Sequence, residues 1–206
     1  MTNEPDVDRL VNEVLSKIIT DNMTTYQKVV AIYDYIIKTS SYVGGHVAGT
    51  DVGYQRMFDL FISMNAYTLL ETHEGVCDNY SSLFVVLTRA IGLETYLMMG
   101  QVKTKGGGTT GHVWTLMKLD GKYYTFDPQV EQNNLVNGKI QYTFFGREES
   151  SMSYLYTYDI SGWFLEECAY YAGITLDYNN QRDSFISLFG NFAVDDERKP
   201  YNNYWL

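Results

Sequence analysis

Apolar residues recur every three to four positions over the first forty residues, which is the spacing of a helix with one buried face. The pattern predicts two helices, over residues 5–20 and 24–39. Thr24 and Gln27 resemble a capping box at the start of the second helix, because each side chain can bond to the backbone N–H of the other residue. The four glycines within residues 40–55 indicate a long loop.

The middle of the chain changes from a helical to an alternating pattern. Short helices are expected within residues 56–71, and a longer helix over 76–91 that stops at Gly92. Polar and apolar residues then alternate, which is typical of strands with one buried face. The dipeptide Asp120-Gly121 is a strong signal for a tight hairpin. The expected strands cover residues 95–102, 112–119, 122–127 and 140–145.

The order of these elements, with helices first and an antiparallel sheet afterwards, predicts an α+β fold. In this fold the helix over residues 76–91 packs on the sheet. A single core is expected over residues 1–150. Residues 151–206 have a weaker pattern, with helices near 163–171 and 183–189. We expect this part to be a C-terminal extension that packs on the core and is not an independent domain.

Composition and charge narrow the range of functions. The chain has 206 residues, of which 45% are hydrophobic, so it can bury a full core and is not expected to be disordered. Its net charge of -10 argues against binding to nucleic acid or anionic membranes, because both require clustered Lys and Arg. No apolar stretch approaches the roughly 18 residues of a membrane span, and no signal peptide is visible at the acidic start.

Cys77 carries the strongest chemical signal in the chain. It lies at the start of the helix predicted over residues 76–91, directly after a Gly-Val pair. The positive end of a helix dipole favours a thiolate over a thiol, so this position predicts an activated cysteine. His112 and Asp127 follow downstream. Cysteine, histidine and aspartate are the components of an activated thiol nucleophile.

The predicted hairpin relates the histidine to the aspartate. With a two-residue turn after Leu119, this residue faces Lys122, which fixes the pairing further along both strands. Asp127 then faces Trp114 and is a diagonal neighbour of His112 on the same side of the sheet. Diagonal pairs lie roughly 7–8 Å apart at the backbone, within reach of a side-chain hydrogen bond. The alternative is that Asp127 merely caps the turn before the proline that follows it.

The remaining candidate residues have simpler explanations. Cys168 lies in a helical stretch and is expected to be a small buried hydrophobe, so no disulfide is predicted. His46 and His73 are expected to be loop residues, and three histidines without metal-ligand spacing do not indicate a zinc site. We therefore expect no metal. Gly106–Gly108 lacks the ending of a phosphate-binding loop and is either a mobile flap or a plain hinge.

Several short motifs occur in a fixed order between Tyr26 and Glu131. They are Lys28–Ile36, Ala66-Tyr67 with Leu70, Gly75-Val76-Cys77 with Tyr80-Ser81, Leu87 to Gly92-Leu93, Gly111-His112-Val113-Trp114, and Asp120–Tyr124 with Asp127-Pro128. In order and spacing this part of the chain resembles the transglutaminase-like superfamily of papain-type cysteine enzymes, in its microbial branch. The resemblance implies a helix that carries the nucleophile, packed on an antiparallel sheet that carries the histidine and aspartate.

The resemblance also implies roles for individual residues. Cys77 would attack an amide carbonyl, His112 would hold the proton and return it to the leaving amine, and Asp127 would orient the imidazole. The backbone N–H of Cys77 would bind the oxyanion together with a side chain upstream, for which Tyr67 is the candidate. Trp114 is a further substrate-binding candidate, although packing beside His112 is its simpler role. No cofactor is implied.

The leading hypothesis is a cysteine peptidase or amidase, or an acyltransferase, that works through a thioester acyl-enzyme. The implied partner is a protein or peptide substrate, such as a cell-wall or glycan-linked peptide. The alternative is a non-catalytic binding or scaffold module of an envelope or multi-domain protein, against which the complete set of Cys, His and Asp argues. A secreted or envelope location is slightly favoured over the cytoplasm, because many relatives of this type are found there.

Overall fold

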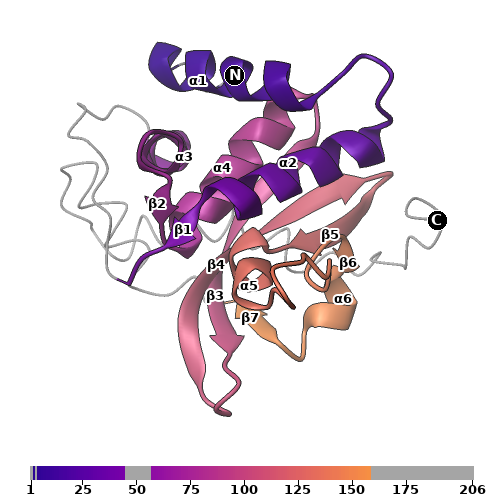
Figure 1. Cartoon of the computed structure of the whole chain (residues 1–206). Coiled ribbons are helices and arrows are strands. Elements are labelled where there is room, and N and C mark those ends of the chain that lie inside the picture. Colours follow the sequence, from indigo (N-terminus) through magenta and orange to yellow (C-terminus); the bar gives the residue numbers. More distant parts are fainter. Residues whose placement is uncertain (1, 3, 45–56, 159–206) are drawn as a thin grey trace.

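The computed structural model describes residues 2, 4–44 and 57–158, in which the N-terminal helices pack on one side of an antiparallel sheet (Figure 1). This arrangement confirms the α+β fold. The helices expected near 163–171 and 183–189 lie outside the described residues, as do His46 and Cys168. The division of the chain at residue 150 stays a prediction.

The first two helices lie close to where the hydrophobic pattern placed them. They are α1 (Pro5–Ile18) and α2 (Thr25–Thr39). The capping box is formed, because the Gln27 N–H donates to Thr24 Oγ1 at 3.2 Å and the Thr24 N–H donates to Gln27 Oε1 at 2.8 Å. The next helix, α3 (Met57–Thr72), is continuous where short helices were expected.

A small parallel sheet leads into the helix that carries Cys77. Its strands are β1 (Ser41–Tyr42) and β2 (Glu74–Gly75), which tie the end of α2 to the chain just before the cysteine. The helix itself, α4 (Cys77–Ala90), ends as expected beside Gly92, whose φ of 87° is in the left-handed region that glycine tolerates.

The main sheet has the strand order β6-β5-β4-β3-β7, and all its strand pairs are antiparallel. The hairpin register is the one predicted, with Leu119 opposite Lys122 and Thr115 opposite Phe126. The β3–β4 hairpin extends beyond the rest of the molecule, at the bottom of Figure 1. The strands are β3 (Glu94–Lys103), β4 (Thr109–Leu119), β5 (Lys122–Phe126), β6 (Arg147–Glu148) and β7 (Tyr156–Tyr158).

The strand expected over residues 140–145 is wrong. This segment is a loop, and its backbone is held by a buried carboxylate, because the Phe144 N–H donates to Glu131 Oε2 at 2.7 Å. The Phe145 ring packs edge-on against Phe126, with ring centroids 5.0 Å apart. The apolar side chains of this loop therefore reach the core although the loop does not pair with a strand. The short strand β6 and helix α6 (Glu149–Met152) follow.

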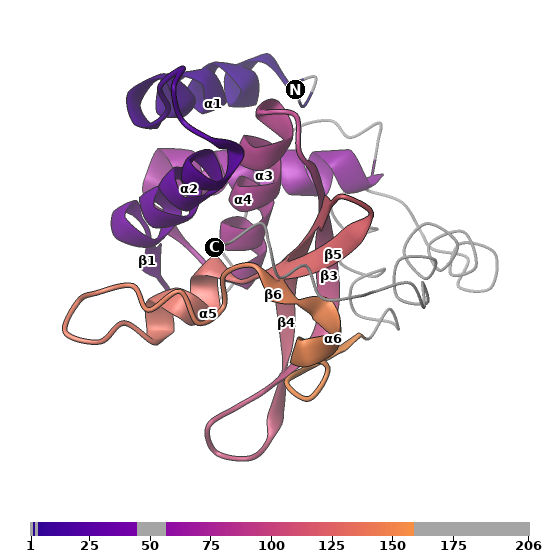
Figure 2. The ribbon, with the colours of Figure 1, turned by 90° about the vertical axis from the view of Figure 1, so that its right-hand side faces the viewer.

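The two faces of the sheet bury different clusters of side chains. One face packs against α4, which lies between the sheet and the other N-terminal helices (Figures 1 and 2). Along β4, Val113 and Met117 belong to this larger core, whereas Trp114 and Leu116 face the opposite side. The second cluster consists of Met98, Val102, Trp114, Leu116, Tyr123, Met152 and Tyr156.

Candidate active site

Cys77 is the first residue of α4, and the chain before it is tightly held. The Val76 N–H donates to Asn79 Oδ1 at 2.9 Å, and Asn79 Nδ2 donates to Asn65 Oδ1 on α3, also at 2.9 Å. A Cβ atom at Gly75 would lie 2.6 Å from the Cβ of Asn79, a distance that real side chains do not adopt. The packing of α3 against α4 therefore fixes the position at which α4 begins, and with it the position of Cys77.

The first turn of α4 meets β4 at an edge that β5 leaves open. β5 ends at Phe126 because a proline opens the next helix, α5 (Pro128–Asn133), and turns the chain away. The backbone of Val113 then lacks a strand partner on that side. Ser81 Oγ donates to the Val113 carbonyl at 2.9 Å, and the Val113 N–H bonds to the sulfur of Cys77. The thiol therefore lies beside the residue that follows His112.

His112 and Asp127 form a buried pair. Nε2 of His112 lies 2.6 Å from Oδ2 of Asp127, and the exposed fractions of the two residues are 3% and 0%. The Val130 N–H donates to the other carboxylate oxygen, Oδ1, at 3.0 Å, so Asp127 also caps α5. The two alternative roles weighed for Asp127 therefore coexist, and the same carboxylate fulfils both.

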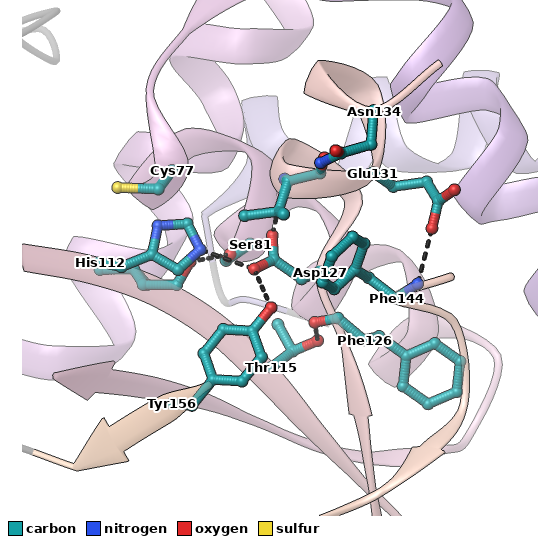
Figure 3. A network of polar contacts seen from close by, with 12 residues as sticks. Cys77, Ser81, His112, Thr115, Phe126, Asp127, Glu131, Asn134, Phe144 and Tyr156 are labelled. Carbon is teal, nitrogen blue, oxygen red and sulfur yellow. Dashed lines mark hydrogen bonds and ion pairs between the residues drawn. The ribbon is translucent and has the colours of Figure 1, made fainter. Parts of the chain in front are cut away.

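The hydrogen bond to Asp127 determines how the imidazole can act. A carboxylate only accepts, so we assign the Nε2 proton to the histidine, which leaves Nδ1 as the free nitrogen of the neutral ring. Figure 3 shows Cys77 beside His112, on the side away from Asp127. The structure thus brings together the three residues that the sequence singled out, in the order cysteine, imidazole, carboxylate.

The surroundings of the sulfur favour the neutral thiol. Burial raises the pKa of the Cys77 thiol well above its usual value, and the Asp78 carboxylate, which accepts from the sulfur at 3.4 Å, raises it further. The Val113 N–H lowers the pKa but does not outweigh these effects. The thiolate predicted from the helix start is therefore not the resting form, because burial and Asp78 dominate over the helix end.

Two aromatic rings surround the imidazole. The ring of His112 lies nearly parallel to that of Trp114, with centroids 6.2 Å apart, and also stacks on Tyr156 at 6.1 Å. Trp114 is fully buried, so its position supports packing beside His112, and its substrate-binding role stays a prediction. The Tyr156 hydroxyl donates to Oδ2 of Asp127 at 2.7 Å. Sequence reasoning did not identify Tyr156, because it lies in a three-residue strand without a readable pattern.

Two further tyrosines lie on elements that adjoin the start of α4. Tyr67 lies on α3 and packs, partly buried, against the larger core, so its role as an oxyanion donor stays a prediction. Tyr42 on β1 is 48% exposed, and the nearby Cys77 and Asp78 contribute, after burial, to a raised pKa of its hydroxyl. Tyr42 therefore lies at the solvent-accessible side of the cysteine, where a substrate would approach.

Two kinds of feature are absent from the described residues. No group of three or more His, Cys, Asp or Glu side chains in this part of the chain is arranged to hold a metal ion. Among the helices formed by residues 2, 4–44 and 57–158, none combines the length and apolar character that crossing a membrane requires.

The chain was compared with known proteins. The family model of the transglutaminase-like superfamily matches residues 12–128. One similar solved structure, of a candidate cysteine protease from Cytophaga hutchinsonii, is 20% identical, with a TM-score of 0.43, over 63% of this chain and 40% of that one. Another, of a TGase, is 16% identical, with a TM-score of 0.42, over 72% of this chain and 36% of that one. The alignments span less than half of either solved chain. No curated protein matches significantly.

Proposed function

Because the chain belongs to the transglutaminase-like superfamily, we propose that it cleaves or transfers the acyl group of an amide or peptide bond through an acyl-enzyme on Cys77. One observation carries this proposal. A buried pair of His112 and Asp127, 2.6 Å apart, lies beside a cysteine whose sulfur accepts from the adjacent Val113 N–H. A structural role alone does not require a thiol beside an imidazole that a carboxylate orients.

The proposed reaction starts from the neutral thiol. Nδ1 of His112 takes the proton from the sulfur as the sulfur forms a bond to the carbonyl carbon of the amide. The tetrahedral intermediate then breaks its C–N bond, and the imidazolium of His112 returns the proton to the leaving amine. A thioester on Cys77 remains. Water or a second amine then attacks this thioester with His112 as the base, which releases a carboxylic acid or a new amide and restores the thiol.

The neighbouring residues have defined parts in this scheme. Asp127 keeps Nδ1 free by accepting from Nε2, and its negative charge stabilises the imidazolium that forms during the reaction. The backbone N–H of Cys77, which is unpaired at the first turn of a helix, is a donor for the oxyanion. Tyr67 is the proposed second donor. Tyr42 is proposed to contact the substrate where it approaches the sulfur.

The proposed substrate is a protein or a peptide, such as a cell-wall or glycan-linked peptide. Hydrolysis and acyl transfer share the same thioester and differ only in whether water or an amine attacks it. We favour hydrolysis, by a peptidase or amidase, because no described element near Cys77 supplies a second domain that would present an acceptor amine.

The alternative is a non-catalytic binding or scaffold module. One observation favours it, namely the raised pKa of the Cys77 thiol, because a group held neutral by burial is a weaker nucleophile unless a base assists it. The two functions therefore differ in a measurable property, which is whether His112 assists the sulfur.

The test is a panel of peptide amides and glutamine-containing peptides, each with and without a primary amine. Released amine or ammonia and the mass of the protein are measured together. We expect turnover and a thioester adduct on Cys77, both lost in Cys77→Ser and His112→Gln. The matched control is His73→Asn, which replaces an exposed histidine of left-handed backbone conformation and should retain full activity.

The same panel separates acyl transfer from hydrolysis, and either of them from the scaffold role. Incorporation of the added amine would identify acyl transfer, whereas release of the free acid alone would identify hydrolysis. If no peptide gives turnover or an adduct, or if Cys77→Ser remains as active as the unaltered protein, the enzymatic proposal fails. The first of these results favours the scaffold module.

A further inference from the structure

We propose that Tyr156 is a positioning residue, which holds the Asp127 carboxylate, and through it the imidazole of His112, in a single orientation. The proposal rests on the proposed function, since it concerns the same site. It extends that function to a strand that lies beyond the residues matched by the family model, which end at 128.

The sheet brings Tyr156 to this position through the edge strand β7. β7 pairs with β3, so that Tyr156 lies opposite Val102 and Tyr158 lies opposite Gly100. On its other side β3 pairs Gly100 with His112. Directly paired residues of an antiparallel sheet point to the same face, and at this row the middle strand has no side chain. Gly100 therefore leaves space in which the rings of His112 and Tyr156 stack at 6.1 Å.

The carboxylate of Asp127 is held from several directions. Oδ2 accepts from both Nε2 of His112 at 2.6 Å and the Tyr156 hydroxyl at 2.7 Å, while Oδ1 accepts from the Val130 N–H at 3.0 Å (Figure 3). Asp127 is fully buried, so water is not at hand to replace a missing donor. Donors from β7 and from α5 on different oxygens fix the plane of the carboxylate, and this plane sets the direction in which the imidazole points.

Tyr156 is a donor and not a competing acid. Burial raises the pKa of its hydroxyl far above the usual value, and the charge of Asp127 raises it further, so the proton stays on the tyrosine. Its ring also packs against Trp114 at 4.9 Å, which keeps the hydroxyl in place. Tyr154 and Glu131 raise the pKa of the Tyr156 hydroxyl further, and the buried Tyr33 of α2 also interacts with Tyr156. On the other side of the pair, Cys77 of α4 interacts with Asp127.

The hydroxyl has a predictable effect on the imidazole. Oδ2 accepts from two donors, so each of these two hydrogen bonds is weaker than a single one would be. Tyr156→Phe keeps the ring and removes only the hydroxyl donor. We expect the remaining hydrogen bond from Nε2 of His112 to Oδ2 to strengthen in this variant, which moves the NMR signal of the Nε2 proton downfield.

The experiment compares Tyr156→Phe with the unaltered full chain and with Tyr154→Phe. Tyr154 is 66% exposed and two residues away, which makes it a matched control for loss of a tyrosine hydroxyl. The Nε2 proton of His112 is followed by NMR, and alkylation of Cys77 by iodoacetamide is followed across pH. Tyr156→Phe should show the downfield shift of the Nε2 proton and a roughly fivefold slower His112-dependent alkylation, the loss expected for one hydrogen bond.

The outcomes distinguish failure of this proposal from failure of the proposed function. If His112→Gln slows alkylation of Cys77 but Tyr156→Phe leaves both the alkylation rate and the Nε2 proton signal of His112 unchanged, the positioning role of Tyr156 is wrong while the proposed function survives. If His112→Gln has no effect on alkylation, the proposed function fails. A downfield shift of the Nε2 proton in Tyr156→Phe supports the positioning role in either case, because the NMR signal does not depend on catalysis.

Discussion

The sulfur of Cys77 experiences opposing electrostatic effects. The first turn of α4 and the Val113 N–H favour the thiolate, whereas burial and the carboxylate of Asp78 favour the thiol. Burial of the sulfur is the largest of these effects, and Asp78 adds to it because Asp78 is itself buried, with an exposed fraction of 5%, so that its charge is poorly screened by water. The residue after the nucleophile thus reinforces the neutral resting form of the sulfur.

Asp78→Asn tests this conclusion. The amide keeps the size of the side chain and removes its charge, so the pKa of the Cys77 thiol should fall and alkylation by iodoacetamide at pH 7.5 should become roughly threefold to tenfold faster. Glu74→Gln is the control, because it removes one exposed negative charge from β2. Equal rates in Asp78→Asn and the unaltered protein would show that Asp78 does not govern the thiol.

Tyr42 gives a second prediction at this scale. Its ring is 48% exposed beside Cys77, so Tyr42→Ala should weaken substrate binding more than the chemical step. We expect KM for the best peptide of the panel to rise roughly fivefold while kcat changes less than twofold, in line with one lost aromatic contact. Tyr26→Ala, at a comparably exposed ring, should leave both unchanged. A fall in kcat alone would contradict a binding role.

Residue patterns predicted some contacts and missed others for identifiable reasons. The pairing of His112 with Asp127 could be predicted, because a two-residue hairpin turn fixes the register and the register fixes which side chains share a face. The raised pKa of the Cys77 thiol could not be predicted, because it depends on how deeply the sulfur and Asp78 are buried. Tyr156 could not be predicted either, since a three-residue edge strand has too few positions to show alternation.

At the scale of the elements, the approach of α3 and α4 sets the position of the nucleophile. Gly75 on β2 lies against the first turn of α4, because any side chain there would collide with Asn79, which is bonded in turn to Asn65 on α3. The packing in this region also explains why α3 is one continuous helix, which the sequence did not predict. The pattern within 56–71 suggested short helices, whereas tertiary packing extends a single helix, α3, through the whole segment.

Gly75→Ala tests this contact. The added methyl group would lie 2.6 Å from the Cβ of Asn79, so the free energy of unfolding should fall by roughly 1–3 kcal/mol. Urea unfolding of the full chain measures the change. Gly44→Ala is the matched control, because nothing lies within 4 Å of its added Cβ and the effect should stay within about 0.5 kcal/mol. Similar stabilities of the two variants would contradict the tight approach.

At the scale of the whole molecule, a buried carboxylate connects elements that are distant in the sequence. Glu131 on α5 has an exposed fraction of 0% and accepts from the backbone N–H groups of Gln141 at 3.0 Å and Phe144 at 2.7 Å. The Tyr33 hydroxyl on α2 lies within 3.0 Å of the Asp127 carbonyl oxygen and within 3.4 Å of Glu131. This network joins α2, the loop before β6 and the backbone of Asp127 in the candidate site.

Glu131→Gln tests the network. Each oxygen of Glu131 accepts from a backbone N–H, so the amide must turn its NH₂ group toward one of these donors. We expect the free energy of unfolding to fall by roughly 2 kcal/mol or more. Glu13→Gln, which removes an exposed carboxylate paired with Arg9 on α1, should leave the free energy of unfolding nearly unchanged. A loss at Glu131 no larger than that at Glu13 would contradict the network.

The network also explains the error in the predicted sheet. The apolar residues over 140–145 predict a strand, but the backbone N–H groups of Gln141 and Phe144 donate to the Glu131 carboxylate and not to a neighbouring strand. A carboxylate more distant in the sequence can satisfy a backbone in this way without leaving any periodic pattern. The overall α+β arrangement remained predictable, because it depends on long periodic segments and on one hairpin turn.

The most direct test of the account is the pH profile of Cys77 alkylation by iodoacetamide, measured residue by residue in the unaltered protein, in His112→Gln and in His73→Asn. Assistance by His112 predicts that the unaltered protein and His73→Asn react at pH 7 roughly tenfold or more faster than His112→Gln. Profiles that coincide in all three proteins, with the sulfur reacting no faster than an unassisted thiol, would contradict the claim that Cys77 and His112 act as a pair.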